Sequence, residues 1–91
     1  MQHANSKKAQ IIFEILAETI KTLRLKKNKS IRLLADEFEI QKSMISRLEN
    51  GKNEPRLVSI LTLCEALDIK PSELFKIIEE KLPNNFSLIE K

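Results

Sequence analysis

The polar residues of the segment 41–50 carry the groups in this chain best suited to recognition chemistry. Ile45 and Leu48 lie three positions apart, so a helix would place both on its inner face. The outer face would then present Lys42, Ser43, Ser46 and Arg47. A guanidinium can donate two parallel hydrogen bonds to a planar pair of acceptors, and an ammonium is a compact partner for an anion. These residues form either a binding face for a polyanion or the solvated side of an amphipathic helix.

A second short helix is predicted just before this segment. Its apolar positions follow a helical period, with i, i+3, i+4 and i+7 occupied by Ile31, Leu34, Ala35 and Phe38. Ser30 stands at the N-cap position, where its hydroxyl can accept a hydrogen bond from an N–H group of the first turn. Two short helices joined at Ile40 therefore precede the chain's single glycine.

Gly51 predicts where the second of these helices ends. It follows Asn50, and glycine adopts the left-handed conformation that closes many helices. Gln41 occupies the N-cap position of the same helix, where a side chain and nearby N–H groups can hold a phosphate. The expected helix therefore covers residues 42–50.

Composition limits the chain to one small helical domain. It has 91 residues, 42% of them hydrophobic, with one glycine and three prolines. The net charge is +3, but residues 21–56 carry +5 and residues 57–91 carry −2. A basic middle with an acidic end is typical of a nucleic-acid face and a separate non-binding end, although lysine-rich surfaces are common in proteins of other kinds.

Several classes of function find no support in the residue types. No apolar run is long enough to cross a bilayer, and one cysteine cannot form a disulfide framework, so we expect a cytoplasmic protein without a membrane segment. There is no phosphate-cradling glycine loop, no metal-spaced His/Cys set and no nucleophile beside a base. We therefore expect no enzyme activity, no metal and no cofactor, and we interpret Cys64 as a small packed hydrophobe.

Three further helices are expected around this pair. The first should run from about Ala9 to Lys26, after a flexible tail at residues 1–8. The fourth should begin soon after Pro55, with a core stripe made of Leu57, Ile60, Cys64 and Leu67. The fifth should open at Pro71 and end before Pro83, which makes residues 9–82 the folded domain and residues 83–91 a C-terminal tail.

Taken together, these residues resemble the helix-turn-helix of lambda-repressor-like (Cro-type, XRE family) DNA-binding proteins. The resemblance covers roughly residues 16–78. It is carried by Leu34–Ala35, Ile40, Ile45–Gly51, Pro55, Leu57, Leu67, Ile69 and Leu74–Phe75. It implies an all-α fold, a compact five-helix DNA-binding domain whose helix-turn-helix is formed by helices 2 and 3.

The resemblance implies a role for each polar residue of the pair. The DNA base-reading positions fall on Lys42, Ser43, Ser46 and Arg47. The positions that grip the DNA backbone fall on Ser30, Gln41, Asn50, Lys52, Asn53 and Arg56. Arg47 could donate two hydrogen bonds to guanine O6 and N7, whereas Glu54 would repel phosphate and is expected to point away. A structural ion pair between Arg24 and Glu49 is also implied.

Two residues depart from the family pattern. Ile31 stands where the family most often has a glutamine that helps to fix the DNA backbone. Glu39 stands where the family prefers glycine in the turn, and a left-handed conformation there would cost roughly 1–2 kcal/mol. These departures keep open an alternative, a protein-interaction module such as an antitoxin or accessory subunit.

The function that the resemblance implies is sequence-specific transcriptional regulation on double-stranded DNA. We expect a homodimeric repressor that occupies a near-palindromic operator through the major groove. Apolar residues of the fifth helix exceed what one small core absorbs, so the dimer contact is assigned to Phe75, Ile78 and Leu82. The C-terminal tail either joins this contact or folds back over it within one chain. The operator sequence, the regulated genes and the biological setting are not encoded in these patterns.

Overall fold

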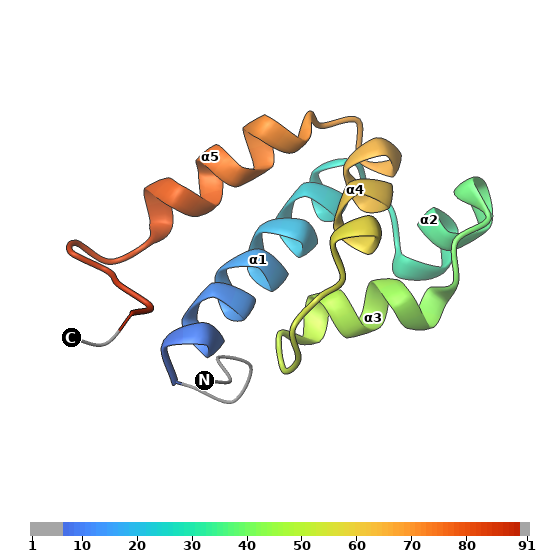
Figure 1. Ribbon diagram of the computed structural model, residues 1–91. Coiled ribbons are helices and arrows are strands. Elements are labelled where there is room, and N and C mark those ends of the chain that lie inside the picture. Colours follow the sequence, from blue (N-terminus) through green and yellow to red (C-terminus); the bar gives the residue numbers. More distant parts are fainter. Residues whose placement is uncertain (1–6, 90–91) are drawn as a thin grey trace.

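The computed structural model describes residues 7–89 and contains five helices over that range. They are α1 (Lys7–Lys26), α2 (Ile31–Phe38), α3 (Lys42–Asn50), α4 (Leu57–Ala66) and α5 (Pro71–Lys81). In Figure 1, α1 runs through the middle of the molecule, with α5 along one side and α2, α3 and α4 on the other. The all-α fold predicted from the sequence is confirmed, and none of these helices combines the length and apolarity that a membrane span requires.

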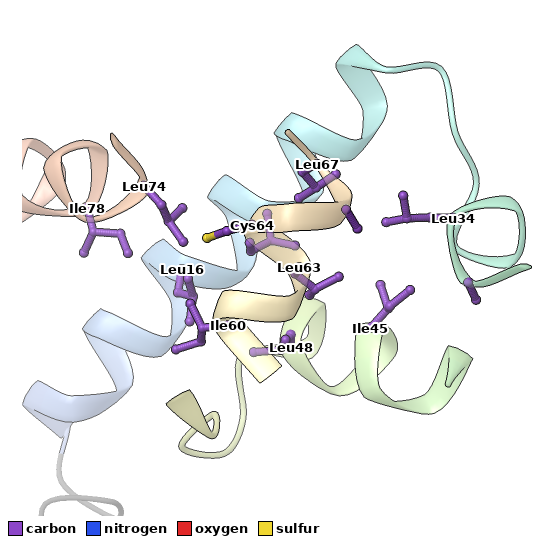
Figure 2. Close-up of a cluster of buried hydrophobic side chains, with 13 residues drawn as sticks. Leu16, Leu34, Ile45, Leu48, Ile60, Leu63, Cys64, Leu67, Leu74 and Ile78 are labelled. Atoms are coloured by element: carbon purple, nitrogen blue, oxygen red, sulfur yellow. The ribbon is translucent and has the colours of Figure 1, made fainter. Parts of the chain in front are cut away.

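Each helix contributes a completely buried side chain to one core. Ile20 of α1, Leu34 of α2, Ile45 of α3, Leu63 of α4 and Leu74 of α5 all have 0% exposure. Figure 2 shows how side chains of this cluster converge between the helices. Full burial of one such side chain contributes about 1.5–3 kcal/mol. The helix-turn-helix is therefore held by the whole chain rather than by its own short helices.

The first helix begins at Lys7, two residues before the predicted start, and residues 1–6 of the expected tail lie outside the described range. Its buried stripe includes Ala9, which the first turn carries into the core at 3% exposure. Farther along α1, the Thr19 hydroxyl donates a hydrogen bond of 2.7 Å to the Ile15 carbonyl and lies 3.3 Å from the Lys81 ammonium of α5. Because α1 starts early, Ala9 in its first turn lines a hollow together with residues of α5 and of the C-terminal segment.

Two residues expected in the core are exposed, and one that was not expected is buried. The fourth helix begins soon after Pro55, as predicted, and Leu57, its first residue, is 63% exposed. Phe38, the last residue of α2, is 44% exposed and its ring lies 5.5 Å from the Lys29 ammonium. The buried face of α4 is rotated toward Leu63. Of the four residues predicted for that face, Ile60, Cys64 and Leu67 are in the core.

The thiol of Cys64 packs inside this core as predicted from its lone occurrence. The residue is 1% exposed, and burial raises the pKa of the thiol. A protonated thiol is a poor nucleophile, so the group behaves here as a small apolar side chain.

The residues predicted to cap α2 and to form the turn before α3 do so in the structure. Ser30 caps α2, and its hydroxyl oxygen accepts a hydrogen bond of 3.0 Å from the Leu33 N–H. At the other end Glu39 is left-handed, with φ of 53°, and the next N–H, that of Ile40, bonds the Ala35 carbonyl at 3.0 Å. The turn therefore imposes on glutamate the backbone strain that the departure from glycine predicts.

Replacing Glu39 with glycine should raise the free energy of unfolding by about 0.5–1 kcal/mol. Relief of the left-handed strain, about 1–2 kcal/mol, exceeds the extra chain entropy that glycine loses on folding. Urea denaturation followed by circular dichroism measures the change. Glu39→Ala is the matched control, since it removes the same carboxylate but keeps the Cβ atom, and an equal gain in that variant would contradict the strain argument.

Gly51 ends α3 as predicted, with φ of 66°. A Cβ atom at this position would lie 3.2 Å from the Ala17 Cβ and 3.3 Å from the Phe13 carbonyl oxygen. Glycine is needed twice here, for the left-handed backbone and for the close approach of the loop to α1. This contact fixes where the chain leaves α3 and enters the loop toward α4.

Candidate nucleic-acid interface

The accessible face of α3 is determined by its buried side. Ile45 is 0% and Leu48 6% exposed, so the helix cannot rotate without exposing both. The opposite side is accessible to solvent, with Lys42, Ser43 and Arg47 exposed and Ser46 half-buried. The four predicted base-reading residues thus share one accessible face, with the two cations at either end of it.

A buried ion pair fixes α3 relative to α1. The Arg24 Nε lies 2.7 Å from Glu49 Oε2, and the Arg24 Nη2 donates a second hydrogen bond of 2.9 Å to Glu49 Oε1. The side chains are 8% and 7% exposed, and the remaining Arg24 nitrogen, Nη1, donates to the Lys29 carbonyl at 2.7 Å. Each of the three guanidinium nitrogens thus donates a hydrogen bond, and such partners are what a buried charge needs to be tolerated.

The protonation state of this pair follows from its hydrogen bonds. The bond to Glu49 raises the pKa of the Arg24 guanidinium, which outweighs the lowering effect of burial, and the nearby negative charge adds to the rise. The hydrogen bonds to Glu49 therefore favour the charged form of Arg24, which is the form that the bridge from α1 to the end of α3 requires.

A hollow of about 580 Å³ is lined by residues of α3 and of the loop that follows it. Among the residues that line it are Gln41 and Arg47 of α3 with Asn53 and Arg56 of the loop. These four come from positions up to fifteen apart in the chain, and the sequence had assigned one to base reading and three to the DNA backbone. The tertiary structure therefore gathers a guanidinium pair and two amides along one groove.

The N-termini of two helices open on this same hollow. Gln41 is the N-cap of α3 and Arg56 is the N-cap of α4, and neither side chain makes a capping hydrogen bond. Among residues 7–89, no side chain accepts a hydrogen bond from the N–H groups of these two first turns, and the helix dipole places partial positive charge there. Together with the two arginines, this arrangement suits an anionic ligand such as a phosphate.

The loop between α3 and α4 is anchored to α1. The Gln10 side-chain amide donates a hydrogen bond of 3.1 Å to the Lys52 carbonyl, which leaves the ammonium of Lys52 exposed. Asn50 and Asn53 are exposed as well. Glu54 was expected to point away, but it lines the hollow, so this expectation is wrong. One carboxylate thus lies among the groups available to a ligand.

The cations of this surface are not neutralised by neighbours. In residues 7–89 the ion pairs are Arg24–Glu49 and Lys29–Glu37. The exposed cations near the hollow and on α3 are outside both pairs, and they are Lys42, Arg47, Lys52 and Arg56. Unpaired surface cations on rigid elements are available for an external anion, and they create a positive potential that attracts one.

Other residues singled out from the sequence lie elsewhere. Ser30 is exposed at the start of α2, where its oxygen serves as the cap and its proton is free for another acceptor. Of the three residues assigned to a dimer contact, Ile78 is buried at 7% exposure in the chain's own core, Leu82 is half-buried and Phe75 is 44% exposed. Ile78 therefore offers little surface to a second chain.

Two residues that contribute to this surface were not identified from the sequence. Gln10 holds the loop from a position forty-two residues away, and no local pattern marks such a contact. Ser59 lines the hollow from the first turn of α4. Its place three residues after Arg56, at the start of a helix, is a signal that could have identified it.

Comparison with known proteins identifies the same helix-turn-helix region. The Helix-turn-helix family model matches residues 20–74, which is more than half of the chain. No match was found among curated protein sequences.

Two solved structures share the fold at low sequence identity. A mutant of the restriction-modification controller protein C.Esp1396I is similar with a TM-score of 0.69 and 18% identity, over 81% of this chain and 94% of that one. The clp gene regulator ClgR from C. glutamicum is similar with a TM-score of 0.67 and 21% identity, over 79% and 92% of the two chains. With the family match and the exposed cationic face of α3, the chain belongs to the XRE-type helix-turn-helix family of DNA-binding regulators.

Proposed function

We propose that this protein is a dimeric, sequence-specific repressor that acts by occupying its operator with α3 in the major groove. The observation that carries the proposal is the unpaired cationic face of α3, held outward by the burial of Ile45 and Leu48. A helix fits the major groove of B-DNA, where each base pair presents a distinct pattern of donors and acceptors. A DNA-binding protein of this kind acts in the cytoplasm, at the nucleoid.

Base reading is assigned to the outer face of α3. Arg47 is exposed at the edge of the hollow, and its guanidinium suits the O6 and N7 acceptors of guanine. Lys42 lies in the first turn and can reach a guanine or a phosphate, while Ser43 and Ser46 have short hydroxyls that accept or donate. Specificity therefore depends mainly on Arg47, with the other three residues modulating it.

Backbone contacts are assigned to the hollow and its surroundings. A phosphate beside the N-termini of α3 and α4 would be held by N–H groups and by Gln41, Asn53 and Arg56. The same role is assigned to the exposed residues Ser30, Asn50 and Lys52. Such contacts set the register of the protein on DNA without reading its sequence, and Glu54 limits where the phosphate can lie.

The dimer is assigned to the α5 side of the molecule. Phe75 and Leu82 keep exposed surface there, and two-fold symmetry would space two copies of α3 one turn of DNA apart on a near-palindromic site. The two structural neighbours carry the names of a controller protein and a gene regulator, which supports regulation as the role. Repression by occupancy requires no further domain.

Selection of bound duplexes from a random DNA pool, at a stated salt concentration, tests the proposal. We expect enrichment of a near-palindrome whose half-sites lie about one helical turn, 10–10.5 base pairs, apart. Affinity for the enriched site should fall steeply as salt is raised, because phosphate contacts release counterions. A pool that stays random after repeated rounds would refute sequence-specific binding, and a single unpaired half-site would refute the dimer.

One observation supports a second candidate, a protein-interaction module such as an antitoxin or accessory subunit. Leu57, Val58 and Leu61 on α4 are 63%, 74% and 40% exposed and lie within one turn of each other. Clustered exposed apolar side chains mark many protein-binding surfaces. Binding to DNA that is weak and nearly independent of salt would favour this candidate over the first.

A further inference from the structure

A second hollow, of about 340 Å³, lies between α1, α5 and the C-terminal segment. Its lining is mainly apolar and includes Leu16 of α1 with Phe75, Ile78, Leu82 and Leu88. All three residues that the sequence assigned to a dimer contact are in this set. Leu88 is in it too, and Leu88 belongs to the tail that follows α5. The tail therefore shares a surface with the residues assigned to a second copy.

A structured turn brings the tail back to this surface. The Phe86 N–H donates a hydrogen bond of 3.1 Å to the Pro83 carbonyl, and Asn85 adopts φ of 60°, a conformation that asparagine tolerates well. Beyond the turn, the Ser87 hydroxyl donates to the Ile89 carbonyl at 3.1 Å. In Figure 1 the segment after α5 reverses toward the beginning of α1. Local bonds thus hold the fold-back in place.

Burial differs sharply between adjacent tail residues. Leu88 is half-buried along the hollow, whereas Ile89 is 69% exposed and lies outside it. Phe86 is half-buried as well. One apolar side chain of the tail therefore lines the hollow together with Phe75, Ile78 and Leu82, and its neighbour of similar size does not.

We propose that residues 83–89 compete with a second copy of the chain for this hollow, so that release of the tail limits dimer formation. The proposal rests on the dimeric function proposed above and adds its regulation. In a protomer with the tail in place, Leu88 stands along the hollow beside Phe75 and Leu82, where a partner would have to pack, and release of the tail removes this obstruction. DNA with two half-sites would then favour the released form, because it binds two recognition helices at once.

The expected change in dimer affinity follows from the coupling between release of the tail and dimerisation. Removing the half-buried part of one leucine should shift the tail toward release about five-fold, and the apparent affinity scales with the fraction of competent protomers. Since both protomers must release the tail, the dissociation constant of the dimer should fall by up to about twenty-five-fold.

Sedimentation equilibrium of the full-length protein over a range of concentrations tests the proposal. Leu88→Ser is the test variant and Ile89→Ser the matched control, since it removes a similar apolar side chain one residue away from the hollow. We expect tighter self-association for Leu88→Ser and an unchanged constant for Ile89→Ser. Circular dichroism of both variants checks that the helices are intact.

Other outcomes would overturn the proposal. Weaker self-association of Leu88→Ser would mean that the tail is part of the dimer contact, and equal constants for the two variants would mean that the tail does not compete. Absence of self-association in all three proteins would remove the equilibrium on which the competition depends. The DNA selection described above is read independently, so a monomer that still enriches one half-site would separate failure of this inference from failure of DNA binding.

A second readout uses the absence of tryptophan from the chain. In Leu88→Trp the indole would lie against the hollow in the monomer and be released on dimerisation. Its emission should shift to longer wavelength as protein concentration rises, whereas Ile89→Trp should emit like an exposed indole throughout. An emission from Leu88→Trp that stays constant while the protein dimerises would contradict tail release.

Discussion

Replacing Glu49 with alanine should lower the free energy of unfolding by about 3–5 kcal/mol. The substitution removes both carboxylate hydrogen bonds from Arg24, a residue that is only 6% exposed in the intact fold. An uncompensated buried charge costs more than the pair contributes when it is intact, and a domain of this size has only about 5–15 kcal/mol in total. Urea denaturation followed by circular dichroism measures the loss.

A surface ion pair of the same length provides the matched control. Lys29 and Glu37 are 2.7 Å apart, like the shorter contact of the buried pair, but their side chains are 22% and 42% exposed. Solvent screens that pair, so Glu37→Ala should cost only about 0–1 kcal/mol. Similar losses in Glu49→Ala and Glu37→Ala would contradict the role of burial.

The double variant Arg24→Met/Glu49→Leu separates the charge from the packing. Replacement of a buried ion pair by apolar side chains of similar volume is often neutral or stabilising. We therefore expect most of the stability lost in Glu49→Ala to return in the double variant. A double variant as unstable as the single one would show that the position is sensitive to shape rather than to the unpaired charge.

Arg47→Ala should reduce discrimination at one base pair in each half-site by about 1–3 kcal/mol. Its guanidinium is the group on α3 best able to make two hydrogen bonds to one base, and no other residue of that face can replace it. Binding of the selected operator and of a set of single-base variants, measured at one salt concentration, gives the change position by position. Uniform weakening across all the variants would instead place Arg47 on the DNA backbone.

Lys52→Ala should show the opposite pattern. Its exposed ammonium in the loop is assigned to a phosphate, so all sequences should bind more weakly by the same factor. The slope of log affinity against log salt should fall by about 1, because one phosphate is no longer neutralised by the protein. Lys76→Ala removes an exposed cation from α5 and is the charge-matched control. Equal weakening by Lys76→Ala and Lys52→Ala would indicate that only net charge matters.

The variants at Glu49 and at Arg47 test two different sides of α3. The pair of Arg24 and Glu49 holds the end of α3 against α1, while Arg47 lies on the free side of the same helix. A destabilised variant at Glu49 that is still folded at low temperature should bind DNA, because the reading residues are untouched. Loss of binding by that folded variant would indicate that the ion pair also sets the angle of α3.

The positions of the helices and the accessible side of α3 could be predicted from the sequence. Helix ends depend on local chemistry: the Ser30 cap, the left-handed Gly51 and Pro71 at the first position of α5 act within one turn of the chain. The outward side of α3 follows from the spacing of Ile45 and Leu48 for the same reason. Such features need only neighbours three or four residues away, and a sequence displays those directly.

The packing of the helices against each other determines which apolar residues are buried and which distant groups meet. The exposure of Leu57, the burial of Leu63 and the position of Leu88 along the hollow beside α5 all depend on this packing. The bond from Gln10 to the Lys52 carbonyl likewise joins segments that share no local pattern. Periodicity gives the direction of a side chain from its own helix, whereas burial also depends on what other elements place in front of it.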